Sequence, residues 1–456
     1  MNNLHALSRV LVVLVATLLY SSYGWADCGC AAGCDTNGNC NRCGCAADAG
    51  ACDANGCGCD NNGDGCGCQA NGNGCEANGD GCGCDANGDG CGCAAGGNDC
   101  DCCSWCNLGE AWTLQECDNC MGITYGGWAS VGYHSDQTPL SDLFNDQRSF
   151  NDRAGVVNLH QAWVYAEREA CGQCEWDWGF RVDLMYGTDA QKTQAFGQTN
   201  GWDTDWDNGG YGWALPQAYV TLNKDDLTIQ LGHFYTLIGY EVVPAPDNFF
   251  YSHSLTMFNS EPFTHTGVLA SYAYDEDVTF YAGWTAGWDT AFDSLNGGSN
   301  FLGGFTVPLL EDLTLTYILT AGNMGLRGEG YTHSLVFDWV IDDCWEYVLQ
   351  SDLVDLDFGA VNNDFFAPGI DFNSQIGVNQ YLFYTFNDCL KVGGRFEWWQ
   401  TDNRDRYEAT FGANIRPHAN VVLRPEVRYD WGSQALVPTT ANGEALIFGI
   451  DAVLTF

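Results

Sequence analysis

The chain has 456 residues and a formal charge of −43 at pH 7, with only 16 Lys and Arg. This excess of negative charge repels phosphates, so it excludes nucleic acid as a partner. The length suffices for one large domain or two ordinary ones. The 26 cysteines are typical of a chain that resides in an oxidising compartment.

Residues 1–26 predict a secretory signal. Arg9 precedes an apolar run from Val10 to Tyr20, and the small residues Gly24 and Ala26 lie where cleavage is expected. The alternative is a membrane anchor, but the run is shorter than the roughly 20 residues that a spanning helix needs. No other apolar run is long enough for such a helix, so we expect export beyond the inner membrane.

Residues 27–120 differ in composition from the rest of the chain. Cys, Gly, Asn, Asp and Ala dominate, and 22 of the 26 cysteines lie here. A nine-residue repeat reads CGCDNNGDG at 57–65, CGCQANGNG at 66–74 and CGCDANGDG at 82–90. Because large aliphatic residues are almost absent, this segment has too little apolar surface for a core. We interpret it as an acidic, low-complexity repeat segment.

Disulfides and calcium are two alternatives for ordering this segment. The pattern D-x-N-x-D-G, which begins an oxygen-ligand calcium loop, occurs twice. The fit is incomplete, because Asn71 and Gly96 stand where an EF-hand has a bidentate Glu. Zinc is less favoured, since thiolate sites need reduced cysteines. The candidate calcium ligands are Asp60, Asn62, Asp64, Asp85, Asn87 and Asp89; no other cofactor is expected.

Beyond Cys120 a pattern of long strands persists to the end of the chain. Most of these segments are longer than the five or six residues usual in soluble sheets, and they match a tilted strand that crosses a bilayer. Residues 121–456 therefore predict an all-β, up-and-down transmembrane barrel. The sixteen predicted strands are 124–134, 156–169, 175–187, 213–224, 227–239, 264–275, 277–288, 299–310, 313–323, 331–342, 345–358, 372–387, 389–401, 406–418, 421–432 and 445–456.

Side chains in these segments alternate between two faces. In 421–431 the polar face carries Arg424, Glu426, Arg428 and Asp430, and the intervening residues are mainly apolar. A soluble sandwich also alternates. Here, however, aromatic residues gather near the strand ends, as the girdles of membrane barrels do.

The connections between predicted strands alternate between short and long, with 402–405 an exception. Short periplasmic turns and longer outer loops are typical of transmembrane barrels. An even number of strands then places both barrel ends, and the Cys-rich segment, on the periplasmic side. The four cysteines outside that segment fall in or beside predicted periplasmic turns. We expect them to form disulfides with each other or with the segment; they are Cys171, Cys174, Cys344 and Cys389.

From about Gly126 to Phe456 the chain resembles outer-membrane porins of the OmpL-like putative β-barrel porin family. The likeness lies in LGHFYTLIGYEVVPAPDNFFYSHS at 231–254, FTHTGVLASY at 263–272, and the strand ending in Phe456. The resemblance implies a barrel that forms a diffusion channel in the outer membrane. It does not cover the Cys-rich segment.

A sixteen-stranded barrel is wide enough for an aqueous channel, which needs a constriction. In general porins the loop after the fifth strand folds into the lumen, and here that loop is 240–263. An acidic loop opposite a basic wall orders polar solutes. The alternative is that the arginines pair locally with Glu397, Glu408 and Glu426. The candidate constriction residues are Glu241, Asp247, Glu261, Arg395, Arg424 and Arg428.

We therefore predict a porin for small hydrophilic solutes or ions, with outer-membrane lipid and small polar solutes as partners. The net charge favours cations, and a homo-oligomer is compatible with the class. An enzyme is disfavoured because the eight His are scattered without a Ser–His pair. The alternative function is a structural barrel that anchors a disulfide-linked acidic stalk to a cell-envelope partner.

Overall fold

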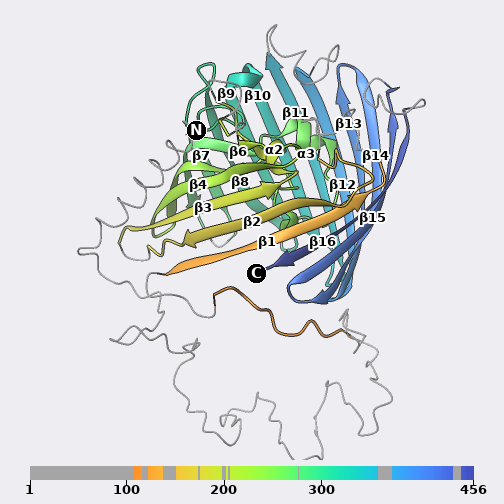
Figure 1. The fold of residues 1–456 in the computed structure, drawn as a ribbon. Helices are drawn as coiled ribbons and strands as arrows, with labels where there is room; N and C mark the ends of the chain where they lie inside the picture. Colours follow the sequence, from red (N-terminus) through yellow and green to blue (C-terminus); the bar gives the residue numbers. More distant parts are fainter. Residues whose placement is uncertain are drawn as a thin grey trace, which may run out of the picture.

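The computed structural model describes residues 106–115, 122–136, 150–172, 175–197, 202–203, 206–275, 277–357, 372–434 and 443–456. Sixteen antiparallel strands close into one barrel, in which β1 pairs with both β2 and β16 (Figure 1). The strands are β1 Ile123–His134, β2 Asn158–Arg168, β3 Asp177–Gly187, β4 Gly212–Lys224, β5 Leu227–Tyr235, β6 Thr264–Ala273, β7 Thr279–Thr285, β8 Ser299–Leu310, β9 Leu313–Asn323, β10 Glu329–Val340, β11 Trp345–Asp357, β12 Ser374–Asn387, β13 Leu390–Thr401, β14 Arg404–His418, β15 Val421–Gly432 and β16 Ala445–Thr455.

The predicted fold class is confirmed, because every predicted strand overlaps one observed strand. The largest differences in bounds are at 227–239 and 277–288, where the observed strands end at Tyr235 and Thr285. The backbone leaves the barrel wall after Tyr235 and begins the long connection 236–263. The alternation of side chains in the sequence continues past this point, so it predicted a strand that is too long.

Alternation sets the two faces of the wall, as β16 illustrates. Leu446, Phe448 and Ile450 point outward and are exposed, whereas Ile447 and Asp451 point inward and are buried. Exposed apolar residues recur outside the barrel on neighbouring strands, including Phe411 on β14 and Val427 on β15. An apolar outer face and a more polar inner face suit a barrel in lipid.

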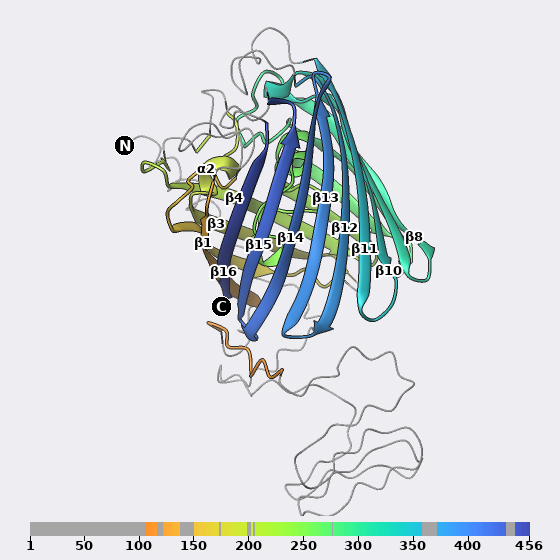
Figure 2. The same cartoon turned by 90° about the vertical axis from the view of Figure 1, so that its right-hand side faces the viewer.

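The two ends of the barrel differ in their connections. The connections 225–226, 311–312, 388–389 and 419–420 are all tight and lie at the end where β1 begins (Figure 2). The other end carries the longer loops, apart from the 402–403 hairpin between β13 and β14. Both residues of that turn, Asp402 and Asn403, have positive φ, as a two-residue type I′ hairpin requires.

Short helices are confined to the connections. They are α2 Ala190–Thr193, α3 Leu255–Ser260, η2 Ala245–Asp247 and η3 Gly325–Arg327. None of the helices in the described ranges is long and apolar enough to cross a membrane. The longest connection, 236–263, carries η2 and α3 and lies inside the ring of strands (Figure 1).

Three of the four cysteines outside the repeat segment, Cys171, Cys344 and Cys389, lie at the end with the tight turns, as expected. Cys389, between β12 and β13, forms a disulfide with Cys106. Cys171 and Cys344 are also disulfide-bonded, and Cys174 lies outside the described residues. The signal segment 1–26 and most of the repeat segment lie outside them as well.

Candidate functional site

The connection 236–263, hereafter the inner loop, is the element that shapes the barrel interior. Residues within the loop itself fix part of its conformation. Pro244 precedes η2, and the Ser254 hydroxyl caps α3 by accepting from the Met257 backbone N–H. The Asn248 side chain closes a tight turn by accepting from Val242 N–H. The loop therefore has an internal structure of its own before it meets the wall.

Three arginines of the barrel wall bind the inner loop. Arg395 on β13 donates to Glu241 at 2.6 Å and to the Ser252 carbonyl at 2.8 Å. Arg424 on β15 donates to three loop carbonyls, and Arg428 donates to the His253 carbonyl at 2.6 Å. Carbonyl oxygens held by a guanidinium are fixed in direction, so these bonds determine where the loop backbone runs.

Each of these arginines also has a carboxylate partner on the wall. Arg395 pairs with Glu408 at 2.8 Å, and Arg424 forms a two-bond pair with Asp451. Arg428 pairs in the same way with Asp430. A buried charge is stable only when it is paired and hydrogen-bonded, and all three guanidinium groups meet that condition.

Two wall carboxylates bind the inner loop through backbone N–H groups. Glu397 accepts from the N–H groups of Leu255 and Thr256 at the start of α3, at 2.8 and 2.7 Å. Glu426 accepts from the Tyr251 N–H at 3.0 Å and from Ser252. These bonds satisfy donors that a helix start and a turn leave free. The loop is thus held by groups of both charge signs.

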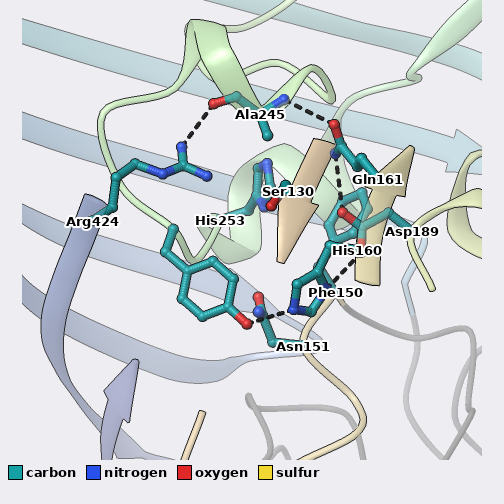
Figure 3. Close-up of a pocket in the computed structure, with 10 residues that line it drawn as sticks. Ser130, Phe150, Asn151, His160, Gln161, Asp189, Ala245, His253 and Arg424 are labelled. Carbon is teal, nitrogen blue, oxygen red and sulfur yellow. Dashed lines mark hydrogen bonds and ion pairs between the residues drawn. The ribbon is translucent and has the colours of Figure 1, made fainter. Parts of the chain in front are cut away.

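The side chain of Tyr251 connects the inner loop to the first strands of the barrel. Its hydroxyl lies 2.6 Å from His160 Nε2 on β2, and His160 Nδ1 lies 3.3 Å from Asp189 (Figure 3). Wall glycines make room for this ring, because a Cβ at Gly132 or Gly449 would lie within 3 Å of it.

A small, water-sized cavity remains between the inner loop and this part of the wall (Figure 3). Gln161 bridges across it, accepting from Ala245 N–H and donating to the Val243 carbonyl and to Asp189. His253 also lines the cavity, and burial lowers the pKa of its ring below 6.5. The cavity is walled by groups already bonded to one another.

The inner loop ends at a buried pair of carboxyl groups. Glu261 accepts from Gln350 at 2.6 Å, and the same Gln350 nitrogen donates to Asp352 at 3.0 Å. Burial, and next the charge of Asp352, hold the pKa of Glu261 well above its usual range. At the other end of the loop burial opposes ionisation of Glu241, but Arg395, His253 and the Ser254 N–H together outweigh it and the pKa is lowered. The pKa values of Glu261 and Glu241 are therefore shifted in opposite directions.

Asp247 occupies a different position from these bonded groups. It ends η2 and is exposed to solvent. The surrounding protein partly desolvates its carboxyl group and raises its pKa, and Arg181 on β3 is the opposing charge. Arg181 is 21% exposed and pairs with Glu167 on β2, itself 25% exposed, and with Asp183. The side of the inner loop toward β2 and β3 thus presents accessible charges of both signs to the lumen.

The six predicted constriction residues therefore divide between two environments. Glu241 and Arg395 meet directly, while Arg424 and Arg428 contact the loop backbone, and these three arginines are at most 4% exposed. The electric field of these arginines therefore acts within packed protein and not across an open lumen. Of the expected local pairings, Arg395–Glu408 occurs, but Glu397 and Glu426 bind loop N–H groups instead.

Sequence reasoning missed several functional residues, namely Gln161, Glu167, Arg181, Gln350, Asp430 and Asp451 in the lumen. The inward face of the β3 segment did carry Arg181 next to Asp183, and that was the available signal. The calcium candidates Asp60 to Asp89 lie outside the described residues. Within the described ranges no group of three or more His, Cys, Asp or Glu side chains is arranged to hold a metal ion.

A closed sixteen-stranded barrel with an apolar outer face and an inward-folded loop defines an outer-membrane porin. The family model "putative beta-barrel porin-2, OmpL-like" matches residues 122–456. The chain belongs to this porin family and is a passive outer-membrane channel.

Two solved structures are similar to the chain, and the first of them supports the fold. The outer-membrane channel DcaP of Acinetobacter baumannii superposes with a TM-score of 0.50 at 10% identity, covering 73% of this chain and 97% of that one. The anion-selective porin from Comamonas acidovorans gives 0.48 at 12% identity, covering 73% and 99%. No curated protein matches the chain in sequence.

Proposed function

We propose that small hydrophilic solutes and ions cross the barrel on the side of the inner loop that faces β2 and β3. The observation that carries this proposal is the contrast in exposure. Arg395, Arg424 and Arg428 are sealed under the loop, whereas Asp247 and Arg181 remain accessible. The narrow part of the route is then bounded by Asp247 on the loop and by Arg181 with Glu167 on the wall.

The accessible lumen charges favour cations. Glu167, Asp247 and Glu346 face the lumen as carboxylates, against Arg181 and Lys391 as cations. Lys391 and Arg181 are each already paired with one of these carboxylates or with Asp183. Asp247 then adds an accessible negative charge to this balance, because opposite charges paired at short range cancel at the distance of a passing ion.

The test is the reversal potential under a KCl gradient, compared between the wild-type channel and Asp247→Asn. We expect the substitution to lower the ratio of cation to anion permeability without changing folding. The matched control is Glu311→Gln, which removes another exposed carboxylate, from a tight turn at the rim. An unchanged ratio in Asp247→Asn, or an equal change in the control, would refute this route.

Catalysis has no role in the proposal, since the lumen histidines serve as partners of loop and wall groups. His160 is bonded on both nitrogens, to Tyr251 and to Thr188 or Asp189. The further proposals are that residues 1–26 direct export, that 27–120 is a periplasmic repeat segment, and that 121–456 is the channel domain. Disulfide linkage of the repeat segment to the rim supports the second role of anchoring an acidic stalk in the envelope.

A further inference from the structure

The join between β1 and β16 differs from every other strand pair in the barrel. Each other neighbouring pair is also connected by a turn or loop, whereas no turn or loop connects β1 to β16. That ladder runs from His134–Gly449 to Trp128–Thr455, and a last pair of backbone bonds joins Gly127 to Phe456. We call this join the seam.

Beyond Gly127 the edge of β1 continues without a rung from β16. Gly127 directs its N–H and carbonyl toward Phe456. Strand groups repeat every second residue, so Tyr125 N–H and the Ile123 carbonyl point to the same side. An open row of such groups is normally covered or paired.

The side chain of Gln115 pairs with this edge. Its Oε1 accepts from the Tyr125 N–H at 3.1 Å, and its Nε2 donates to the Ile123 carbonyl at 3.1 Å. One amide therefore makes the two bonds that a peptide unit of a neighbouring strand would make. Gln115 extends the ladder of the seam by one rung.

The residues before Gln115 attach to the turns at the same end of the barrel. Trp112 exchanges two hydrogen bonds with the Asn420 side chain, at 3.0 and 2.8 Å, and that side chain also donates to the Thr455 carbonyl. The Leu108 carbonyl accepts from Ala419 N–H. Asn420 thus joins the segment 106–115, hereafter the strap, to the last strand.

A covalent bond fixes the other end of the strap. Cys106 is joined to Cys389 in the turn between β12 and β13. From there to β1 the strap passes four to five strand spacings of about 4.8 Å. Its nine residue-to-residue steps reach about 30 Å when extended, so the strap is long enough to cross that distance.

We propose that the strap is a covalent lock across the seam of the barrel. It joins the β12–β13 turn to the free edge of β1, so β1 and β16 cannot separate at this end without breaking the Cys106–Cys389 bond or pulling Gln115 from its rung. The lock does not depend on conduction, so it stands or falls separately from the proposed channel function.

The test is hydrogen–deuterium exchange of the full folded chain in detergent, followed in peptides from β1 and β16. In Gln115→Ala we expect the Tyr125 amide to exchange at least several-fold faster. In Cys106→Ser/Cys389→Ser we expect faster exchange along the seam from Trp128 to His134, with the β9–β10 ladder unchanged. Gln194→Ala is the matched control, because Gln194 also makes two side-chain hydrogen bonds but lies in the loop at the other end.

Should the double Cys variant fail to assemble, the folded wild-type protein is reduced in place with dithiothreitol. Reduction must then raise the exchange rate at the seam in the wild type. In the Gln115→Ala protein, whose Tyr125 amide already exchanges freely, reduction must cause no further increase. Exchange at the seam that is the same in wild type, both variants and reduced protein would overturn the lock. Faster exchange spread equally over all sixteen strands would also overturn it, since that indicates general destabilisation.

Discussion

Arg395 on the wall and Glu241 on the inner loop lie 2.6 Å apart, although 154 positions separate them in the chain. Both side chains are buried, and the same guanidinium holds Glu408 and the Ser252 carbonyl. This residue pair therefore ties the start of the loop to the opposite wall.

Replacing Arg395 by Gln should release the inner loop. The change leaves Glu241 and Glu408 buried without their cation, and removal of one partner of a buried pair costs about 3–5 kcal/mol. We expect larger or noisier single-channel currents and a lower free energy of unfolding. Planar-bilayer recording and urea titration measure the two effects.

Lys391→Gln is the control for this substitution. Lys391 also pairs with a carboxylate, Glu346 at 2.7 Å, but about 30% of each side chain is exposed. Exposed pairs contribute at most about 1 kcal/mol. Currents that stay as quiet in Arg395→Gln as in Lys391→Gln would contradict the anchoring role of Arg395.

The far end of the loop should respond to pH through Glu261. Its pKa is raised by burial and by Asp352, so the folded protein keeps a proton that the unfolded chain loses above its ordinary value of 4.5. Stability from this group is therefore full at acid pH and declines as pH rises from there through the raised pKa. Glu261→Gln should remove this dependence.

Hydrogen exchange of the peptide that contains α3, measured at several pH values, checks this prediction. The wild type should exchange progressively faster at alkaline pH, after correction for the intrinsic pH dependence of exchange. The Gln variant, which keeps an acceptor for Gln350, should not show the excess. An identical pH profile in the two proteins would mean that Glu261 is not the titrating group.

The lipid-facing surface gives a prediction about stability alone. Phe411, in the middle of β14, is 63% exposed on the outer face, and Leu309 is 47% exposed near the turn at the end of β8. A lysine at the bilayer midplane costs about 2–4 kcal/mol, but near an interface only about 0–1. Phe411→Lys should therefore lower the free energy of unfolding in lipid vesicles much more than Leu309→Lys does. Equal losses would mean that the outer face is not in lipid.

The barrel could be predicted from sequence because each strand carries its own signal. In a segment such as 445–456 the period of two records which side chains meet lipid, and sixteen such segments separated by turns define an up-and-down barrel. The limits of the prediction lay at Tyr235 and Thr285, where apolar residues continue past the wall into loops that are themselves buried.

The site was harder to predict because its contacts join distant segments. Local pairing of Glu397 with an arginine was one of two alternatives, yet its oxygens accept from Leu255 and Thr256, more than 140 positions away. Alternation shows that Glu397 points inward, but it does not show which loop backbone arrives there. The role of Gln115 was not predicted for the same reason, because it depends on which residues of β1 are not paired with β16.

The most direct test of the account is the single-channel behaviour of the folded chain in a planar bilayer under a KCl gradient. We predict steady, ohmic current steps with a reversal potential whose sign shows preference for the cation. Folded barrels that give no current, or a reversal potential of the opposite sign, would contradict an open route past Asp247.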